Sequence, residues 1–199
     1  MRKLQHSEIA SRRYSVEELQ HLGRFPIVLV LHNIRSAYNV GSIFRTADAA
    51  RIEKLLLCGL TPHPPHPRID KTALDATQTV PWQYERSIFT VLEQLRQAHY
   101  TIAALEITSE SRLYSSLTPD LFPLALIIGN EITGVDDEIL RHVDYALEIP
   151  MFGLKHSLNV SVATGIMVYE ALRVYTRNFT ENFPEERLKT FYGAAFTDR

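Results

Sequence analysis

Short apolar runs alternate with longer segments of helical periodicity along this 199-residue chain, and this alternation constrains its fold more than any other feature. The apolar runs are typical of buried strands, and they occupy residues 26–31, 54–58, 100–106, 124–128 and 145–149. The segments with helical spacing lie at residues 39–50, 87–99, 136–143 and 159–175. Strands that alternate with helices predict an α/β fold, with a mainly parallel sheet and helices on both of its faces.

The length supports one domain with short extensions. We predict this domain at residues 25–175, between a basic N-terminal extension (1–24) and a C-terminal extension (176–199). Within the first extension, Ser15 followed by Glu18 predicts a capping box that opens a short helix. Four prolines in residues 61–68 predict a loop there.

Composition narrows the class of protein. Hydrophobic residues make up 45% of the chain and charged residues 22%, as in a packed globular domain. No apolar run approaches the roughly 20 residues of a membrane span, so we expect no membrane insertion. Cys58 is the single cysteine, and the first residues lack the apolar stretch of a secretory signal, so we expect a cytoplasmic setting without disulfides.

Basic charge gathers toward the N-terminal end of the chain. The net charge of −2 argues against a uniformly basic protein that coats nucleic acid. Residues 1–13 nevertheless carry a local charge of +3, and so do residues 32–71. These basic stretches are either a local grip on phosphate or an ordinary solvated surface.

Three polar clusters each follow a predicted strand. They begin at His32, Gly129 and Gly153. Because ligands bind beyond the carboxyl ends of parallel strands, these clusters can line one site although a hundred residues separate them. The alternative is purely structural, with Asn39 and Asn159 as helix N-caps and Gly129 ending a strand.

Common site patterns are absent from the sequence. No Gly-x-Gly-x-x-Gly motif follows the first strand, and there is no phosphate-binding loop with a Lys-Ser or Lys-Thr ending. Cys58, His63 and His66 lack a fourth ligand nearby, so we expect no metal site. Ser157 lacks the glycine pattern of a hydrolase nucleophile.

The three clusters resemble, in order and spacing, the three motifs of the SpoU-type RNA 2′-O-ribose methyltransferases, the TrmH family of the SPOUT superfamily. The motifs read NVGSIFRT from Asn39, IIGNEITG up to Gly134, and IPMFGLKHSLNVSVA from Ile149. The resemblance covers residues 33–170. It implies a parallel α/β sheet whose C-terminal part forms a trefoil knot, S-adenosylmethionine as the cofactor, and a homodimer.

The resemblance also implies the roles of particular residues. The catalytic positions are Arg45, Asn39, Ser157, Asn159 and Glu131. The cofactor-binding positions are Leu105, Gly129, Ile149 and Leu158. The chain departs from the family pattern at His32 and at residues 36–38, where relatives often have an acidic residue and an Asp-Pro pair. Because only about two dozen residues precede the first predicted strand, we expect no counterpart of the N-terminal RNA-binding domain that some ribosomal RNA relatives have.

The expected substrate is RNA, with transfer RNA preferred because the chain is compact and ribosomal RNA as the alternative. Two rival functions stay open, namely a non-catalytic RNA-binding module and a small-molecule α/β enzyme. Arg45 is essential in our interpretation. Because a guanidinium is always protonated in proteins, it suits phosphate binding or stabilisation of a developing alkoxide better than proton abstraction.

The helix predicted at residues 159–175 carries apolar residues on two faces. One stripe includes Ala163, Met167 and Ala171, and a second includes Val162 and Tyr169. The second face can pack on another subunit or in the chain's own core.

Neutralising Arg12 and Arg13 together is expected to weaken RNA binding, because these residues and Arg35 are the predicted RNA contacts of the basic stretches. Each lost phosphate contact lowers the slope of log affinity against log salt by roughly 0.7 to 0.9. Titrations at several salt concentrations measure this slope, and S-adenosylmethionine affinity serves as the control. An unchanged slope would make the N-terminal stretch a solvated tail.

Overall fold

A computed structural model of the protein describes residues 1–10, 14–21 and 23–179. Contacts divide the chain into two units, of which the larger is Phe25–Asn178 and the smaller includes Met1–Arg24. Arg12, Arg13 and most of the predicted C-terminal extension lie outside the described residues. The predicted domain division stays a prediction.

The N-terminal unit contains two short helices, α1 (His6–Ala10) and α2 (Val16–His21). The predicted capping box of α2 is confirmed. The Ser15 backbone N–H donates to a Glu18 carboxylate oxygen at 2.7 Å, and the Glu18 N–H donates to Ser15 Oγ at 3.1 Å.

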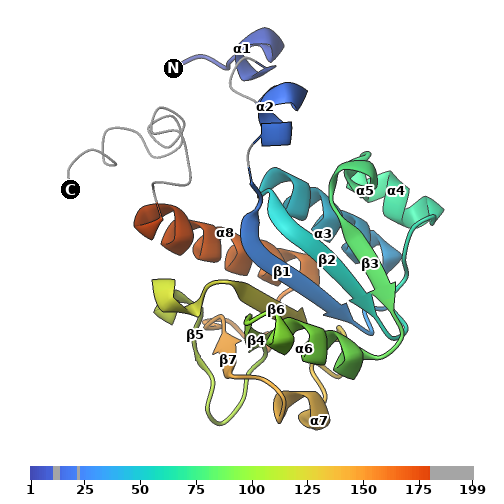
Figure 1. Cartoon of the computed structure of the whole chain (residues 1–199), viewed down its shortest axis with the longest axis vertical. Helices are drawn as coiled ribbons and strands as arrows, with labels where there is room; N and C mark the ends of the chain where they lie inside the picture. Colours follow the sequence, from blue (N-terminus) through green and yellow to red (C-terminus); the bar gives the residue numbers. More distant parts are fainter. Residues whose placement is uncertain (11–13, 22, 180–199) are drawn as a thin grey trace. The chain divides into compact units, whose positions relative to one another are not determined.

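The larger unit is built on a parallel sheet, which confirms the predicted α/β class (Figure 1). Within the described residues the strands follow the order β3-β2-β1-β6-β4-β7-β5, and each pair of neighbouring strands is parallel. The strands are β1 (Phe25–His32), β2 (Ile52–Cys58), β3 (Trp82–Glu85), β4 (Thr101–Leu105), β5 (Arg112–Leu113), β6 (Leu124–Ile128) and β7 (Tyr145–Glu148). The central strands β1 and β6 are buried on both faces, which explains the apolar runs at residues 25–31 and 124–128.

Helices cover both faces of the sheet, as predicted. The elements between and after the strands are α3 (Ala37–Ala49), α4 (Pro67–Ala73), α5 (Ala76–Thr79), α6 (Ile88–Gln97), the 3₁₀ turns η1 (Tyr114–Ser116) and η2 (Pro119–Leu121), α7 (Asp137–Leu140) and α8 (Val160–Asn178). Leu29 of β1 shares a core with α3, α4 and α8, whereas Val28 and Val30 share the opposite core with α6. None of the described helices is long and apolar enough to cross a membrane.

The segment between β2 and β3 differs from the sequence prediction. Residues 61–68 were expected to form a loop throughout, but Pro67 and Arg68 begin α4, and His66 Nδ1 caps this helix by accepting the Arg68 N–H at 3.1 Å. Proline fits the first position of a helix because its missing N–H has no partner there. The short edge strands β3 and β5 were also not predicted, since their exposed residues lack an apolar pattern.

Helix α4 packs closely on α3 at Gly41. A methyl group at this position would overlap Thr72 Oγ1 and the Ile69 carbonyl of α4. Glycine is therefore required by the approach of the two helices, at a position that the resemblance placed within the first motif.

Gly41→Ala is expected to lower the free energy of unfolding by about 1–3 kcal/mol, because α4 must move away from α3 to admit the methyl group. Urea unfolding measures this change. Gly23→Ala is the matched control, since a methyl group there meets no atom within 4 Å. Equal stability of the Gly41 variant and the wild type would contradict the packing described.

Candidate active site

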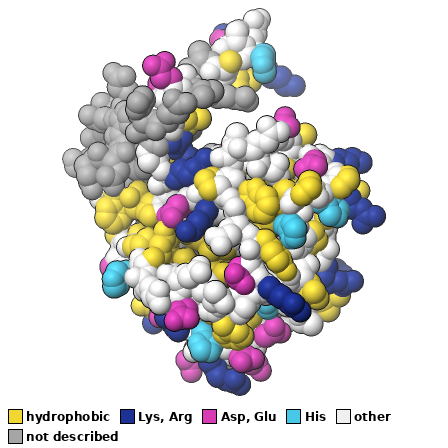
Figure 2. Space-filling model, turned by 45° about the vertical axis from the view of Figure 1, so that its right-hand side comes forward, with side chains coloured by type: hydrophobic (Ala, Val, Ile, Leu, Met, Phe, Trp, Pro, Cys, Tyr) yellow, Lys and Arg dark blue, Asp and Glu magenta, His cyan; other side chains and the backbone are white. Residues whose placement is uncertain are grey.

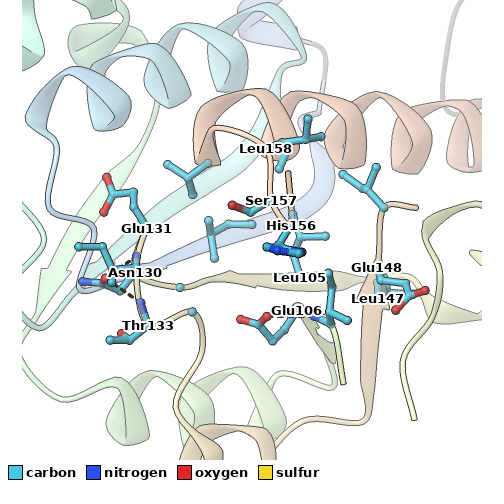
Figure 3. A pocket seen from close by; sticks show the side chains of 18 of the residues that line it. Leu105, Glu106, Asn130, Glu131, Thr133, Leu147, Glu148, His156, Ser157 and Leu158 are labelled. Carbon is cyan, nitrogen blue, oxygen red and sulfur yellow. Dashed lines mark hydrogen bonds between the residues drawn. The ribbon is translucent and has the colours of Figure 1, made fainter. Parts of the chain in front are cut away.

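A cavity of about 340 Å³ lies at the carboxyl ends of β4, β6 and β7 (Figure 3). Its lining comes from four segments that are far apart in the sequence. These segments are residues 105–107, 128–134, 147–151 and 156–163. A few residues within the last two segments do not line the cavity. In Figure 3 Glu131 lies on the side nearest α3, and Glu148 lies on the opposite side. The structure therefore brings the second and third polar clusters to one place.

All four predicted cofactor positions line this cavity, namely Leu105, Gly129, Ile149 and Leu158. Two predicted catalytic residues, Glu131 and Ser157, line it as well. The structure thus gathers these six residues, and their roles stay predictions.

The loop after β6 is held in shape by a tight turn. Asn130 and Gly134 exchange backbone hydrogen bonds at 3.0 and 2.9 Å, and Asn130 Oδ1 accepts the Ile132 N–H at 2.8 Å. Gly134 has φ +69°, and a Cβ at Gly129 would overlap the Gly134 backbone. Both glycines are therefore needed for the chain to turn back on itself beside the cavity.

Glu131 joins this loop to the start of α3. Its carboxylate accepts the backbone N–H groups of Arg35 at 2.8 Å and Ser36 at 3.0 Å, and the Asn39 side-chain amide at 2.9 Å. Free N–H groups and the helix dipole at a helix N-terminus favour an anion. Partial burial disfavours ionisation of Glu131, but these hydrogen bonds together outweigh it and hold its pKa below the ordinary value.

Asn39 continues the connection to the third cluster. Its Oδ1 accepts the Asn159 side-chain amide at 3.1 Å, and Asn159 Oδ1 accepts the Ser161 N–H at 2.9 Å at the start of α8. The expected N-cap role of Asn159 is thus present. The alternative that made Asn39 an N-cap is wrong, because Ser36 caps α3 and accepts the Asn39 N–H at 3.3 Å, which leaves the Asn39 side chain free for Glu131 and Asn159.

Arg45 is exposed on α3, roughly 9 Å along the helix from Asn39 at 1.5 Å per residue. Neither its guanidinium nor that of Arg35 makes a hydrogen bond or ion pair within the described residues. Arg45 does not line the cavity. Its charge is therefore available to a ligand that extends from the cavity over α3.

Two glutamates of the cavity were missed from the sequence. Glu106 accepts the Val135 N–H at 2.8 Å and the Ile107 N–H at 3.0 Å, and Glu148 accepts the Ser111 hydroxyl at 2.6 Å. Their position in or directly after predicted strands that end at the site was a usable signal. Glu106 fixes the loop after β6 from the side opposite Glu131.

Cys58, which was weighed as a metal ligand in the sequence, and His32, which begins the first polar cluster, are both buried. Cys58 is fully buried, and burial raises the pKa of its thiol to about 12. His32 is 9% exposed, and burial lowers the pKa of its imidazole, with Asp136 opposing. No group of three His, Cys, Asp or Glu side chains in the described part of the chain is placed to hold a metal ion.

The sheet and the cavity define a parallel α/β protein with a cavity beyond the carboxyl ends of its strands, where ligands bind in open sheets of this kind. The sequence pattern of the SpoU rRNA Methylase family matches residues 26–169. The chain belongs to this family.

Individual relatives agree with this assignment. The 23S rRNA (guanosine-2′-O-)-methyltransferase RlmB of Neisseria meningitidis serogroup B is 31% identical over 155 residues, which cover 78% of this chain and 61% of that protein. The chain thus spans about three fifths of the length of this curated relative, and the same holds for the relatives from Pseudomonas putida and Pseudomonas syringae pv. tomato.

Solved structures show the same fold. The AdoMet-bound rRNA methyltransferase from Sinorhizobium meliloti superimposes with a TM-score of 0.68 at 26% identity, covering 76% of this chain and 60% of that one. The A. aeolicus TrmH/SpoU tRNA modifying enzyme gives a TM-score of 0.69 at 26% identity, with coverage of 88% and 90%.

Glu131→Gln is expected to destabilise the protein by about 1–2 kcal/mol at neutral pH, because an amide supplies one acceptor oxygen where the carboxylate supplies two. Since the pKa of Glu131 is lowered by folding, its stabilisation is fully present above the unfolded pKa and is lost as pH falls through the folded pKa. Urea unfolding between pH 7 and pH 3 tests this, and the gap between the two proteins should shrink toward the acid end. A gap that does not change with pH would show that the charge of Glu131 is not what stabilises the fold.

Proposed function

We propose that this chain transfers a methyl group from S-adenosylmethionine to a ribose 2′-hydroxyl of RNA, with ribosomal RNA as the substrate. The observation that carries the proposal is the hydrogen-bonded series Glu131–Asn39–Asn159, which connects all three motif segments beside the cavity. The alternative of separate turns and caps gives no reason for these side chains to meet across 92 and 120 residues.

Ribosomal RNA replaces our preference for transfer RNA. The RlmB relatives from Neisseria and Pseudomonas are named as 23S rRNA methyltransferases, and compactness, which favoured transfer RNA, is a weaker argument than these names. Transfer RNA stays the second candidate because the A. aeolicus enzyme, named as tRNA modifying, is matched over 90% of its length.

The cavity fits an adenosyl cofactor. Apolar side chains such as Leu105, Ile149 and Leu158 suit a planar base, and the strand ends around Gly129 offer backbone groups that can bind polar edges. The AdoMet-bound relative from Sinorhizobium meliloti supports the same cofactor. When bound, S-adenosylmethionine supplies a methyl group that is activated by its sulfonium charge.

The residues of the chain then contribute mainly by positioning. A 2′-hydroxyl must lie in line with the methyl group, and holding it there can supply much of the acceleration. We assign Asn39 and Asn159 to orienting the ribose and Ser157 to contacting it at the cavity. Glu131 holds Asn39 directly and Asn159 through Asn39, and it anchors the N-cap residue Ser36 of α3.

Arg45 is assigned to the substrate side. Its unpaired, exposed guanidinium suits bidentate binding of a substrate phosphate or stabilisation of the developing alkoxide. Arg45 is not the proton acceptor in this proposal, because a guanidinium stays protonated in proteins.

We also propose the homodimer, the trefoil knot and the cytoplasmic setting that the family resemblance and the composition implied. Support for the dimer comes from α8, where Met167 and Val174 are buried but Val162 and Tyr169 are 51% and 56% exposed. These exposed apolar side chains form the second face that the sequence predicted. Support for the knot is family membership and the path of residues 149–159, part of which lines the cavity beside the loop after β6.

Transfer of a radiolabelled methyl group to purified 23S rRNA and to bulk transfer RNA tests the function, with excess chelator in each reaction. We expect 2′-O-methylated ribose in ribosomal RNA with no dependence on metal. Label in transfer RNA alone would favour the second candidate. Binding of RNA without any transfer would leave a non-catalytic RNA-binding module.

Arg45→Ala is expected to reduce methyl transfer by at least roughly 100-fold, as loss of a charge-stabilising group does. Its S-adenosylmethionine affinity by calorimetry and its unfolding midpoint should stay near those of the wild type, because Arg45 lies outside the cavity. Arg141→Ala on the loop after α7 is the matched control for loss of an exposed arginine. An equal loss of cofactor affinity would make Arg45 a cofactor-holding residue instead.

A further inference from the structure

An aromatic cluster outside the cavity has no role in the proposed chemistry. Trp82 and Tyr84 lie two residues apart on edge strand β3 and so point to the same face. The His63 ring lies 6.4 Å from the Trp82 ring and 4.6 Å from the Tyr84 ring, measured between centroids. Trp82 in turn contacts Phe44 of α3 at 6.5 Å. The cluster is thus on the α3 side of the sheet, and Phe44 is the neighbour of Arg45 in the chain.

The outer part of the cluster is exposed but held in place. Tyr84 is 38% exposed, and its hydroxyl donates to the Gly59 carbonyl at 2.8 Å. His63 is exposed too, and its Nδ1 lies 3.1 Å from the Pro64 carbonyl. Rings that are already fixed lose little conformational entropy when a flat ligand stacks on them.

Hydrogen bonds connect the loop of this cluster to the cavity. The Leu60 N–H donates to Asn33 Oδ1 at 2.9 Å, and the Asn130 side-chain amide donates to the Asn33 carbonyl at 2.8 Å. Asn130 lines the cavity. Strands β2 and β1 separate β3 from β6, so the cluster lies on the order of 10–15 Å from the cavity at about 4.8 Å per strand. A chain of a few nucleotides can reach both places.

Charge around the cluster is suited to a polyanion. Arg68 lies five residues after His63, and Arg86 lies two residues after Tyr84. Both arginines are exposed. Their guanidinium groups make no hydrogen bond or ion pair within the described residues. The nearby Glu85 carboxylate is engaged by the Ser87 N–H at 3.1 Å. Figure 2 shows the face turned forward from the β3 side of Figure 1, where histidine, hydrophobic, and Lys or Arg side chains lie close to one another.

We infer that the His63–Tyr84 pair stacks an unpaired base of the substrate RNA that flanks the methylated nucleotide. This inference rests on the proposed function and extends its RNA site from Arg45 along α3 to the edge of the sheet. Aromatic side chains bind bases in single-stranded RNA through their π-faces, and unpaired arginines beside them bind phosphates.

Fluorescence titration with short single-stranded ribo-oligonucleotides that carry 2-aminopurine tests this stacking directly. The wild type should quench the 2-aminopurine. Tyr84→Leu and His63→Ala should lose most of the quenching and bind roughly 5- to 150-fold more weakly, the range that follows from one stacked base. Tyr84→Phe keeps the ring and should keep most of the quenching. Unaltered affinity and quenching in Tyr84→Leu would overturn the inference.

Phe89→Leu on α6 is the matched control, because Phe89 is 39% exposed and contacts His142 at 5.3 Å in a similar ring pair. An equal effect of this control would also overturn the inference, since it would reduce the effect to a general loss of aromatic surface. If Tyr84→Leu does not fold, the quenching and affinity of His63→Ala, a substitution in the loop, test the stacking alone.

The outcomes separate this inference from the proposed function. Methyl transfer to RNA by a wild type that shows no quenching would leave the function and remove the stacking site. Quenching without any transfer to RNA would leave the stacking site and remove the methyltransferase.

Discussion

The Glu131 carboxylate is the interaction on which the candidate site depends. It comes from the loop after β6, yet its partners are Arg35 and Ser36 in the turn between β1 and α3 and Asn39 in the first turn of α3. The parallel sheet brings these two loops to the same edge, because β1 and β6 are neighbours. The carboxylate then fixes their spacing to within hydrogen-bond length. Without it, the backbone N–H groups of Arg35 and Ser36, just before α3, would lose this acceptor, and Asn39 would lose one of its two side-chain partners.

The same edge supports two surfaces with different chemistry. The cavity is formed by apolar strand ends and backbone turns, which suits a small ligand held by shape. Helix α3 instead presents the exposed Arg45, and β3 presents the Tyr84 ring, whose hydroxyl is hydrogen-bonded to the Gly59 carbonyl. Asn33, at φ +56°, stands between them and bonds to both the loop after β2 and the loop after β6. Its backbone conformation is one that asparagine tolerates better than most residues, so the two surfaces are joined through a position with little freedom to vary.

Much of the fold could be predicted because the parallel strands are buried on both faces. Leu124–Ile128 matches its prediction, and the other four predicted strands differ from the structure by at most two residues at either end. β3 and β5 were missed because edge strands are held by one neighbour and need no apolar run. The site residues were accessible through the motif resemblance, but their contacts were not. The sequence suggested Asn39 as a helix N-cap. In the structure Ser36 caps α3, and the Asn39 side chain instead donates to Glu131, a contact across 92 residues that the sequence does not reveal. Glu106 was missed for a related reason, since it bonds to Val135, which is 29 residues away.

The long sequence separations within the site have a consequence for how the protein is made. Asn39 pairs with Glu131 across 92 residues and with Asn159 across 120 residues. Contacts of this kind close large loops and therefore form late, after the entropy of bringing distant segments together has been overcome. During synthesis, Asn39 can bond to Asn159 only after the start of α8 has left the ribosome, long after β1 and α3 have been made. A fragment that ends before Asn159 can hold strands and helices but lacks the Asn39–Asn159 hydrogen bond, so the candidate site is complete only once the start of α8 has been made.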